Sequence, residues 1–100
     1  MHEYCLNLIC PLAVEEKLLD ALLESENSEV FTSVQIHSHG APHGRLSAQE
    51  QVMGRGRAMQ IQVLLSQEVL TQLLERFQRD FAGTGIRYWA TPVVFEGEIK

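Results

Sequence analysis

The sequence predicts an α+β fold in which an antiparallel sheet of four strands carries two helices on one of its faces. Three segments alternate apolar and polar residues with a period of two, a fourth is rich in aromatic and branched residues, and two more repeat apolar residues at helical spacing. Their order is strand, helix, strand, strand, helix, strand, which is the split βαβ or ferredoxin-like arrangement. The 100 residues suffice for one domain with a single core, spanning residues 1–100.

The first half of the chain supplies two strands with a helix between them. The run at 4–10 (YCLNLIC) alternates and places Leu6 and Leu8 on one face. Apolar residues then recur at helical spacing from Val14 onwards, until the polar run ESENSE ends the helix. The run at 31–39 (FTSVQIHSH) alternates again and predicts the second strand.

The second half repeats the pattern of strand, helix and strand. The run at 58–65 (AMQIQVLL) alternates, and Ser66 after it is a suitable cap for the next helix. The Gly-Thr-Gly turn at 83–85 ends that helix, and the run at 86–95 (IRYWATPVVF) predicts a final strand in which Pro92 marks an edge or a bend. The apolar stripe of the second helix consists of Val69, Leu70, Leu73, Leu74, Phe77 and Phe81.

The face of the sheet opposite the helices is predicted to be uncovered in a single chain. Alternation in the second strand predicts that Val34 and Ile36 point toward the core and that Gln35, His37 and His39 point away from it. Such a face is too apolar for solvent and too polar for a private core, so it predicts an oligomer assembled through the open side of the sheet. The residues expected there are Cys5, Ile9, Gln35, His37, Gln62 and Leu64.

Composition excludes several functional classes. A formal net charge of -5 argues against binding of nucleic acid, which requires a basic surface. The apolar run after Met1 is too short for membrane insertion and has no basic start, so we expect a cytoplasmic protein. Cys5 and Cys10 lie five residues apart on one strand and point to opposite faces, which predicts two free thiols.

Three histidines fall within seven residues in the run HSHGAPHG. His37 and His39 are two apart on a predicted strand and share a face, and His43 follows a Gly-Ala-Pro turn that can bring it back to them. Neutral imidazole is a common ligand of zinc, copper and nickel, so these residues are a candidate site for a divalent metal. The alternative is that the histidines are solvated or packed in a subunit interface.

A second candidate site lies in the run QVMGRGRA. Gly54 and Gly56 let backbone amides turn toward an anion, while Arg55 and Arg57 supply planar donors for phosphate or carboxylate. The alternative is a flexible hinge with two solvated arginines, because no helix follows the run to complete a nucleotide-binding fingerprint. Both candidate sites lie at the ends of a predicted loop at about 38–57, and a loop of that length in a compact domain is commonly functional.

The sequence does not favour an enzyme. No nucleophile stands beside a base, and no pair of carboxylates has a spacing that suggests acid and base roles.

The order of elements resembles that of the PII-like family of small trimeric signalling proteins. FTSVQIHSHG resembles the strand that leads into the family's long T-loop, MQIQVLL resembles the strand that leaves it, and ERFQRDFAGTGIRYWATPV resembles the helix, turn and last strand. The chain is also similar to CutA-like proteins, and most similar to short PII-like proteins that accompany heavy-metal efflux systems.

The resemblance implies a homotrimer that binds a small-molecule or metal effector in clefts between subunits and signals through the long loop to a membrane transporter or an enzyme. PII-like proteins of the nitrogen-regulatory type bind adenine nucleotides through a Gln-Lys-Gly turn, where this chain reads HSHGAPHG without lysine. Arg55, Arg57 and Arg87 are the basic residues that remain as substitutes.

The leading interpretation is therefore a non-enzymatic, PII-like regulatory sensor, with His37, His39 and His43 as ligands of a divalent metal and with a link to metal efflux or transport. One alternative is a sensor of the same fold that binds a nucleotide or another anion through Gly54, Arg55, Gly56, Arg57 and Arg87. Another is a dimeric ferredoxin-like enzyme of the monooxygenase or isomerase type, with a histidine in a pocket between helices and sheet.

Overall fold

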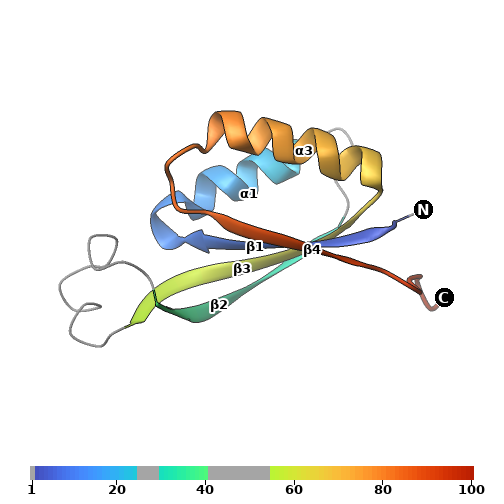
Figure 1. The fold of residues 1–100 in the computed structure, drawn as a ribbon. Helices are drawn as coiled ribbons and strands as arrows, with labels where there is room; N and C mark the ends of the chain where they lie inside the picture. Colours follow the sequence, from blue (N-terminus) through green and yellow to red (C-terminus); the bar gives the residue numbers. More distant parts are fainter. Residues whose placement is uncertain (1, 25–29, 41–54) are drawn as a thin grey trace.

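The computed structural model describes residues 2–24, 30–40 and 55–100. Four antiparallel strands form one sheet in the order β2-β3-β1-β4, and both helices lie on the same side of it (Figure 1). The α+β, ferredoxin-like prediction is thus confirmed. Along the chain the elements are β1 (Tyr4–Pro11), the short turn η1 (Leu12–Val14), α1 (Glu15–Glu24), β2 (Phe31–His39), β3 (Arg55–Leu65), α3 (Gln67–Asp80) and β4 (Arg87–Pro92).

The core lies between the helices and the two central strands. In the pairing of β1 with β3, Leu6 lies opposite Val63 and Leu8 lies opposite Ile61. These side chains therefore share the face beneath the helices. Both helices cover them with apolar stripes, and the most deeply buried side chains are fully excluded from water. The buried residues of the helices are Leu18, Ala21 and Leu22 in α1, and Leu70, Leu73 and Phe77 in α3.

Local chemistry fixes the ends of α3. Its N-terminus is capped by Ser66, whose Oγ accepts a hydrogen bond from the backbone N–H of Val69 at 3.3 Å. After the helix, Gly83 and Gly85 have φ of 79° and 88°, a region that other residues avoid, and the chain reverses there into β4. Neither described helix has the length and apolar composition needed to cross a membrane.

The prediction for the faces of β2 was wrong. Val34 pairs with Gln60 and Ile36 with Ala58, which places both apolar residues on the open side of the sheet, whereas Gln35 pairs with Met59 on the side of the helices. Alternation shows which residues share a face, but it does not show which face is covered. Because β2 is an edge strand, its residues on the side of the helices after Phe31 are exposed polar groups: Ser33, Gln35, His37 and His39.

The boundaries of the predicted long loop also need correction. Ser38 and His39 belong to β2, and the residues from Arg55 to Arg57 belong to β3. The polar, glycine-containing sequence predicts a loop at 38–57, but cross-strand pairing continues the two strands into it. Residues 41–54, with His43 and Gly54, lie outside the described residues.

The two cysteines are free thiols, as predicted, and Cys10 is fully buried in the core. Burial, with a smaller contribution from Glu15, raises the pKa of the Cys10 thiol from 9.0 to about 11. The unfolded thiol ionises at lower pH than the folded one, so we expect stability to fall as the pH rises from 9 to about 11.

A Cys10→Ala variant tests this expectation, because it removes the ionisable group. Its free energy of unfolding, measured by urea denaturation at pH 8, 9, 10 and 11, should fall less steeply than that of the wild type. Parallel pH profiles for the two proteins would contradict the assignment.

Candidate functional site

The β2–β3 pair extends beyond the rest of the sheet. β1 pairs with β3 only as far as Pro11 opposite Ala58, whereas β2 continues to His39 opposite Arg55. The last three pairs therefore form a two-stranded ribbon, which is the lower left end of the sheet in Figure 1. We call these six residues the ribbon end: His37, Ser38, His39, Arg55, Gly56 and Arg57.

Pairing at the ribbon end joins the two candidate sites that the sequence suggested separately. His37 lies opposite Arg57, and His39 lies opposite Arg55. Directly opposed residues of an antiparallel pair have Cβ atoms about 5 Å apart, so the imidazole of His37 and the guanidinium of Arg57 lie on one face within reach of a common ligand. His37, His39 and Arg57 are all exposed, and a ligand can approach them from solvent.

The charges of this cluster favour an anion. Arginine is permanently cationic and presents a planar fork of N–H donors that matches carboxylate and phosphate, and Arg57 stands across from His37. A divalent cation at the same place would be repelled by the guanidinium of Arg57. Among residues 2–24, 30–40 and 55–100 no group of three or more histidine, cysteine or acidic side chains is positioned to hold a metal ion.

Arg87 does not join this cluster within one chain. It lies on β4 opposite Ile9, and both β1 and β3 separate β4 from β2. Neighbouring strands are about 4.8 Å apart, so β4 and β2 are roughly 14 Å from each other. Arg87 also lies on the open side of the sheet, whereas Arg57 is in register with Met59 on the other side.

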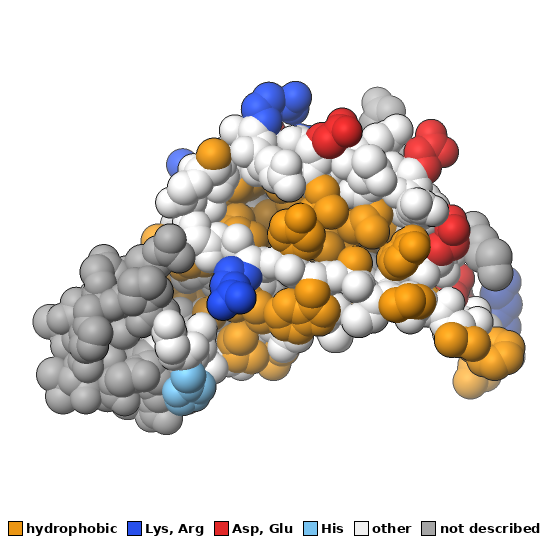
Figure 2. All heavy atoms as spheres, in the orientation of Figure 1, with side chains coloured by type: hydrophobic (Ala, Val, Ile, Leu, Met, Phe, Trp, Pro, Cys, Tyr) orange, Lys and Arg blue, Asp and Glu red, His pale blue; other side chains and the backbone are white. Residues whose placement is uncertain are grey.

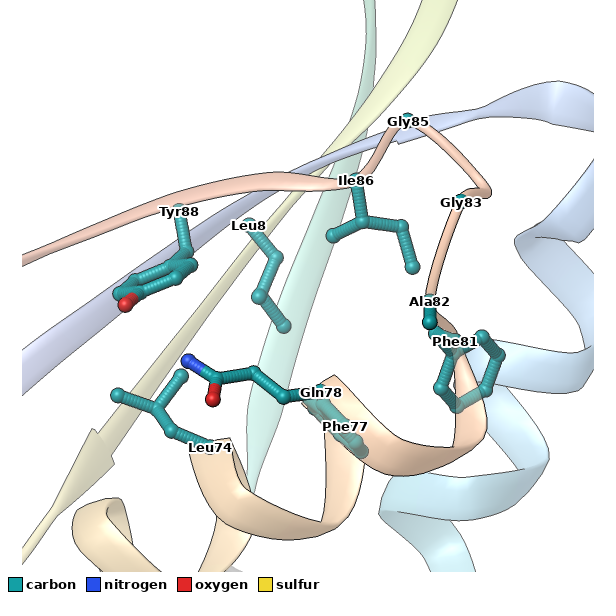
Figure 3. Close-up of a pocket in the computed structure, with 10 residues that line it drawn as sticks. All are labelled: Leu8, Leu74, Phe77, Gln78, Phe81, Ala82, Gly83, Gly85, Ile86 and Tyr88. Carbon is teal, nitrogen blue, oxygen red and sulfur yellow. The ribbon is translucent and has the colours of Figure 1, made fainter.

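Sequence reasoning missed a pocket between α3 and β4. Its volume is about 230 Å³, and it lies where the glycine turn brings the end of α3 over the start of β4 (Figure 3). The amide of Gln78 and the phenol of Tyr88 are the polar side-chain groups in an otherwise apolar lining. The lining residues are Leu8, Leu74, Phe77, Gln78, Phe81, Ala82, Gly83, Gly85, Ile86 and Tyr88.

The enzyme alternative placed a histidine in a pocket between helices and sheet. The residues that line this pocket include no histidine, so this pocket does not provide that feature. The signal for the pocket was present in the sequence as a Gly-Thr-Gly turn between an aromatic helix end and an aromatic strand, but the pattern also fits ordinary packing.

Sequence reasoning also missed which side chains occupy the open face of the sheet. At its centre the side-chain amide of Gln62 donates a hydrogen bond of 2.9 Å to Oδ1 of Asn7, which is only 4% exposed. Apolar side chains surround this pair, and two of them are large and half exposed: Val34 at 56% and Trp89 at 46%. The apolar members of the open face are Ile9, Val34, Ile36, Leu64 and Trp89.

One helical layer and one open sheet face define a ferredoxin-like fold, and solved structures of PII-like proteins share it. A DUF3240 protein of Shewanella baltica OS155 matches with a TM-score of 0.80 at 18% identity, covering 100% of this chain and 99% of that one. CPII of Thiomonas intermedia K12, a nitrogen regulatory PII-like protein, matches with a TM-score of 0.73 at 21% identity, covering 99% and 98%. Its structure contains ADP, AMP and bicarbonate. These likenesses establish the fold.

The family follows from the sequence itself. The profile of the family described as "Protein of unknown function (DUF3240)" matches residues 1–100, and the chain belongs to that family. No curated protein is similar to the chain in sequence.

Proposed function

We propose that this protein is a non-enzymatic PII-like regulator that assembles through the open face of its sheet and binds a small anionic effector at the ribbon end. The pairing of His37 with Arg57 and of His39 with Arg55 is the observation that carries the proposal. It brings the guanidinium of Arg57 and two imidazoles to the end of the ribbon formed by β2 and β3. An effector bound there would signal by favouring one conformational state of the protein over another.

The class of effector follows from the donors. Guanidinium groups bind phosphate and carboxylate oxygens through paired hydrogen bonds. The PII-like protein CPII, which shares the fold, is bound to ADP, AMP and bicarbonate, and all three ligands are anionic. Nucleotide phosphates and bicarbonate are therefore the first effectors to examine.

A divalent metal is the second candidate. It is supported by the exposure of His37 and His39 on one face of an edge strand. With His43 as a third ligand, zinc, copper or nickel would be held by imidazole nitrogens. In that case the partner would be a membrane transporter or an efflux component whose cargo is the metal.

Arg57→Ala is expected to weaken binding of ADP, AMP or bicarbonate by roughly ten- to a hundredfold, because a charge-assisted hydrogen bond contributes about 1.5–3 kcal/mol. Isothermal titration calorimetry of each anion against the wild type and the variant measures this change. Arg57→Lys should retain part of the affinity, since it keeps the charge and loses the planar fork. Arg79→Ala is the matched control, because Arg79 is exposed on α3 beside Asp80.

The same titrations separate the two candidates. If zinc, copper or nickel binds to the wild type and to Arg57→Ala but not to a His37→Ala/His39→Ala variant, the metal interpretation is correct. If none of the three anions binds to the wild type, or if Arg57→Ala binds them equally well, the anion interpretation is wrong.

A further inference from the structure

The C-terminal arm, residues 93–100, exposes three large apolar side chains. Val94 is 82% exposed, Phe95 94% and Ile99 102%. A methyl group added at Gly97 would meet no atom within 4 Å, so there is open space beside Gly97. Three such residues on one short segment form an apolar surface that is typical of a contact with another molecule.

Two contacts direct the arm away from its own pocket. The backbone N–H of Val93 donates to the carbonyl of Glu3 at 2.9 Å, and Nδ1 of His2 lies 3.2 Å from Oε1 of Glu96. These contacts align the arm with the N-terminal end of β1. The pocket lies at the other end of β4, beside Ile86 and Tyr88. Figure 1 shows that β4 runs from the turn after α3 toward the C-terminus.

The pocket between α3 and β4 fits a phenyl ring. A dry cavity of about 150 Å³ lined by Leu, Ile and Phe binds benzene, and this pocket has about 230 Å³ with a lining of the same kind. It is open to solvent at Tyr88, which is 47% exposed. Figure 2 shows hydrophobic side chains along the seam between helices and sheet, and a separate hydrophobic group on the arm.

The residues next to the pocket and the residues of the arm carry opposite charges. Arg87 lies on the edge strand β4 between two pocket residues, Ile86 and Tyr88, with its side chain on the open side of the sheet. On the arm, Glu96 is held by His2, whereas Glu98 makes no ion pair with the described residues. An arm that places Phe95 in the pocket can cross the edge of β4 and bring Glu98 to Arg87.

We infer that the arm of one copy docks on a second copy of this chain, with Phe95 in the pocket between α3 and β4 and Glu98 paired with Arg87. Every copy then carries one arm and one pocket, so the contacts can close a symmetric ring. The inference concerns assembly and does not rest on the identity of the effector.

Photo-cross-linking tests this arrangement. Full-length protein with a diazirine-bearing phenylalanine analogue at position 95 is prepared with natural isotopes and mixed with the same protein labelled with ¹⁵N, and the mixture is dissociated, reassembled and irradiated. We expect cross-links from position 95 to peptides of residues 74–88, with mixed light and heavy pairs. The same analogue at position 23, on the exposed surface of α1, should give none.

A charge reversal supplies the second measurement. Arg87→Glu should lower the yield of these cross-links at least fivefold, and Arg87→Glu/Glu98→Arg should restore it. Cross-links to the pocket of the same chain only, cross-links to other surfaces, or an absence of cross-links would overturn the inference, as would a yield that Arg87→Glu leaves unchanged. Anion titrations on the same samples report separately on the proposed effector.

Discussion

Leu64→Asp is expected to convert the assembled protein into monomers while leaving the chain folded. Leu64 lies on the open face opposite Cys5, with its side chain directed away from the helices. In the proposed assembly this face is sealed by other copies, so an aspartate there becomes a buried charge without a partner. A penalty of about 4 kcal/mol per interface raises the subunit dissociation constant about a thousandfold.

The variant should remain folded because the substitution leaves the core unchanged. Leu64 is only partly buried in the single chain, and the core side of β3 is formed by Ile61, Val63 and Leu65. Native mass spectrometry and sedimentation velocity measure the mass of the assembly, and far-ultraviolet circular dichroism measures the fold. Leu23→Asp, on the solvent side of α1, is the control and should keep the mass of the wild type. An unchanged mass for Leu64→Asp would rule out the open face as the interface.

Most of the fold was predictable because local chemistry specified it. The alternation around Ile61 predicted a central strand, Ser66 predicted the start of α3, and the glycines at 83 and 85 predicted its end. Each of these signals acts over a few residues and does not depend on the remainder of the chain. The order of the elements then left few possible topologies, since connections in small domains are short and rarely cross.

The face of β2 was not predictable in the same way. Whether Val34 points toward the helices depends on the registry of β2 with β3, and that registry is set by tertiary pairing across the 41–54 connection. The correction strengthens the case for assembly, because it replaces Gln35 and His37 on the open face with Val34 and Ile36. The open face is more apolar than the sequence alone suggested.

The candidate site was half predictable. Residue types indicated a histidine cluster and an arginine cluster, but the two lie about twenty residues apart along the chain and were treated as alternatives. Only cross-strand register shows that His37 and Arg57 are neighbours. Their proximity changes the expected ligand, because a metal ion that the histidines alone would bind is repelled by the guanidinium of Arg57.

Leu6→Ala is expected to lower the free energy of unfolding by about 3 kcal/mol, because it leaves a cavity in a closely packed core. Leu6 is 0% exposed, on the central strand β1 beneath both helices. Urea denaturation measures the loss, with both proteins at one concentration because assembly adds to stability. Leu23→Ala, at a position that is 66% exposed, should change stability by less than about 0.5 kcal/mol. A loss below about 1 kcal/mol for Leu6→Ala would mean that helices and sheet do not seal one core.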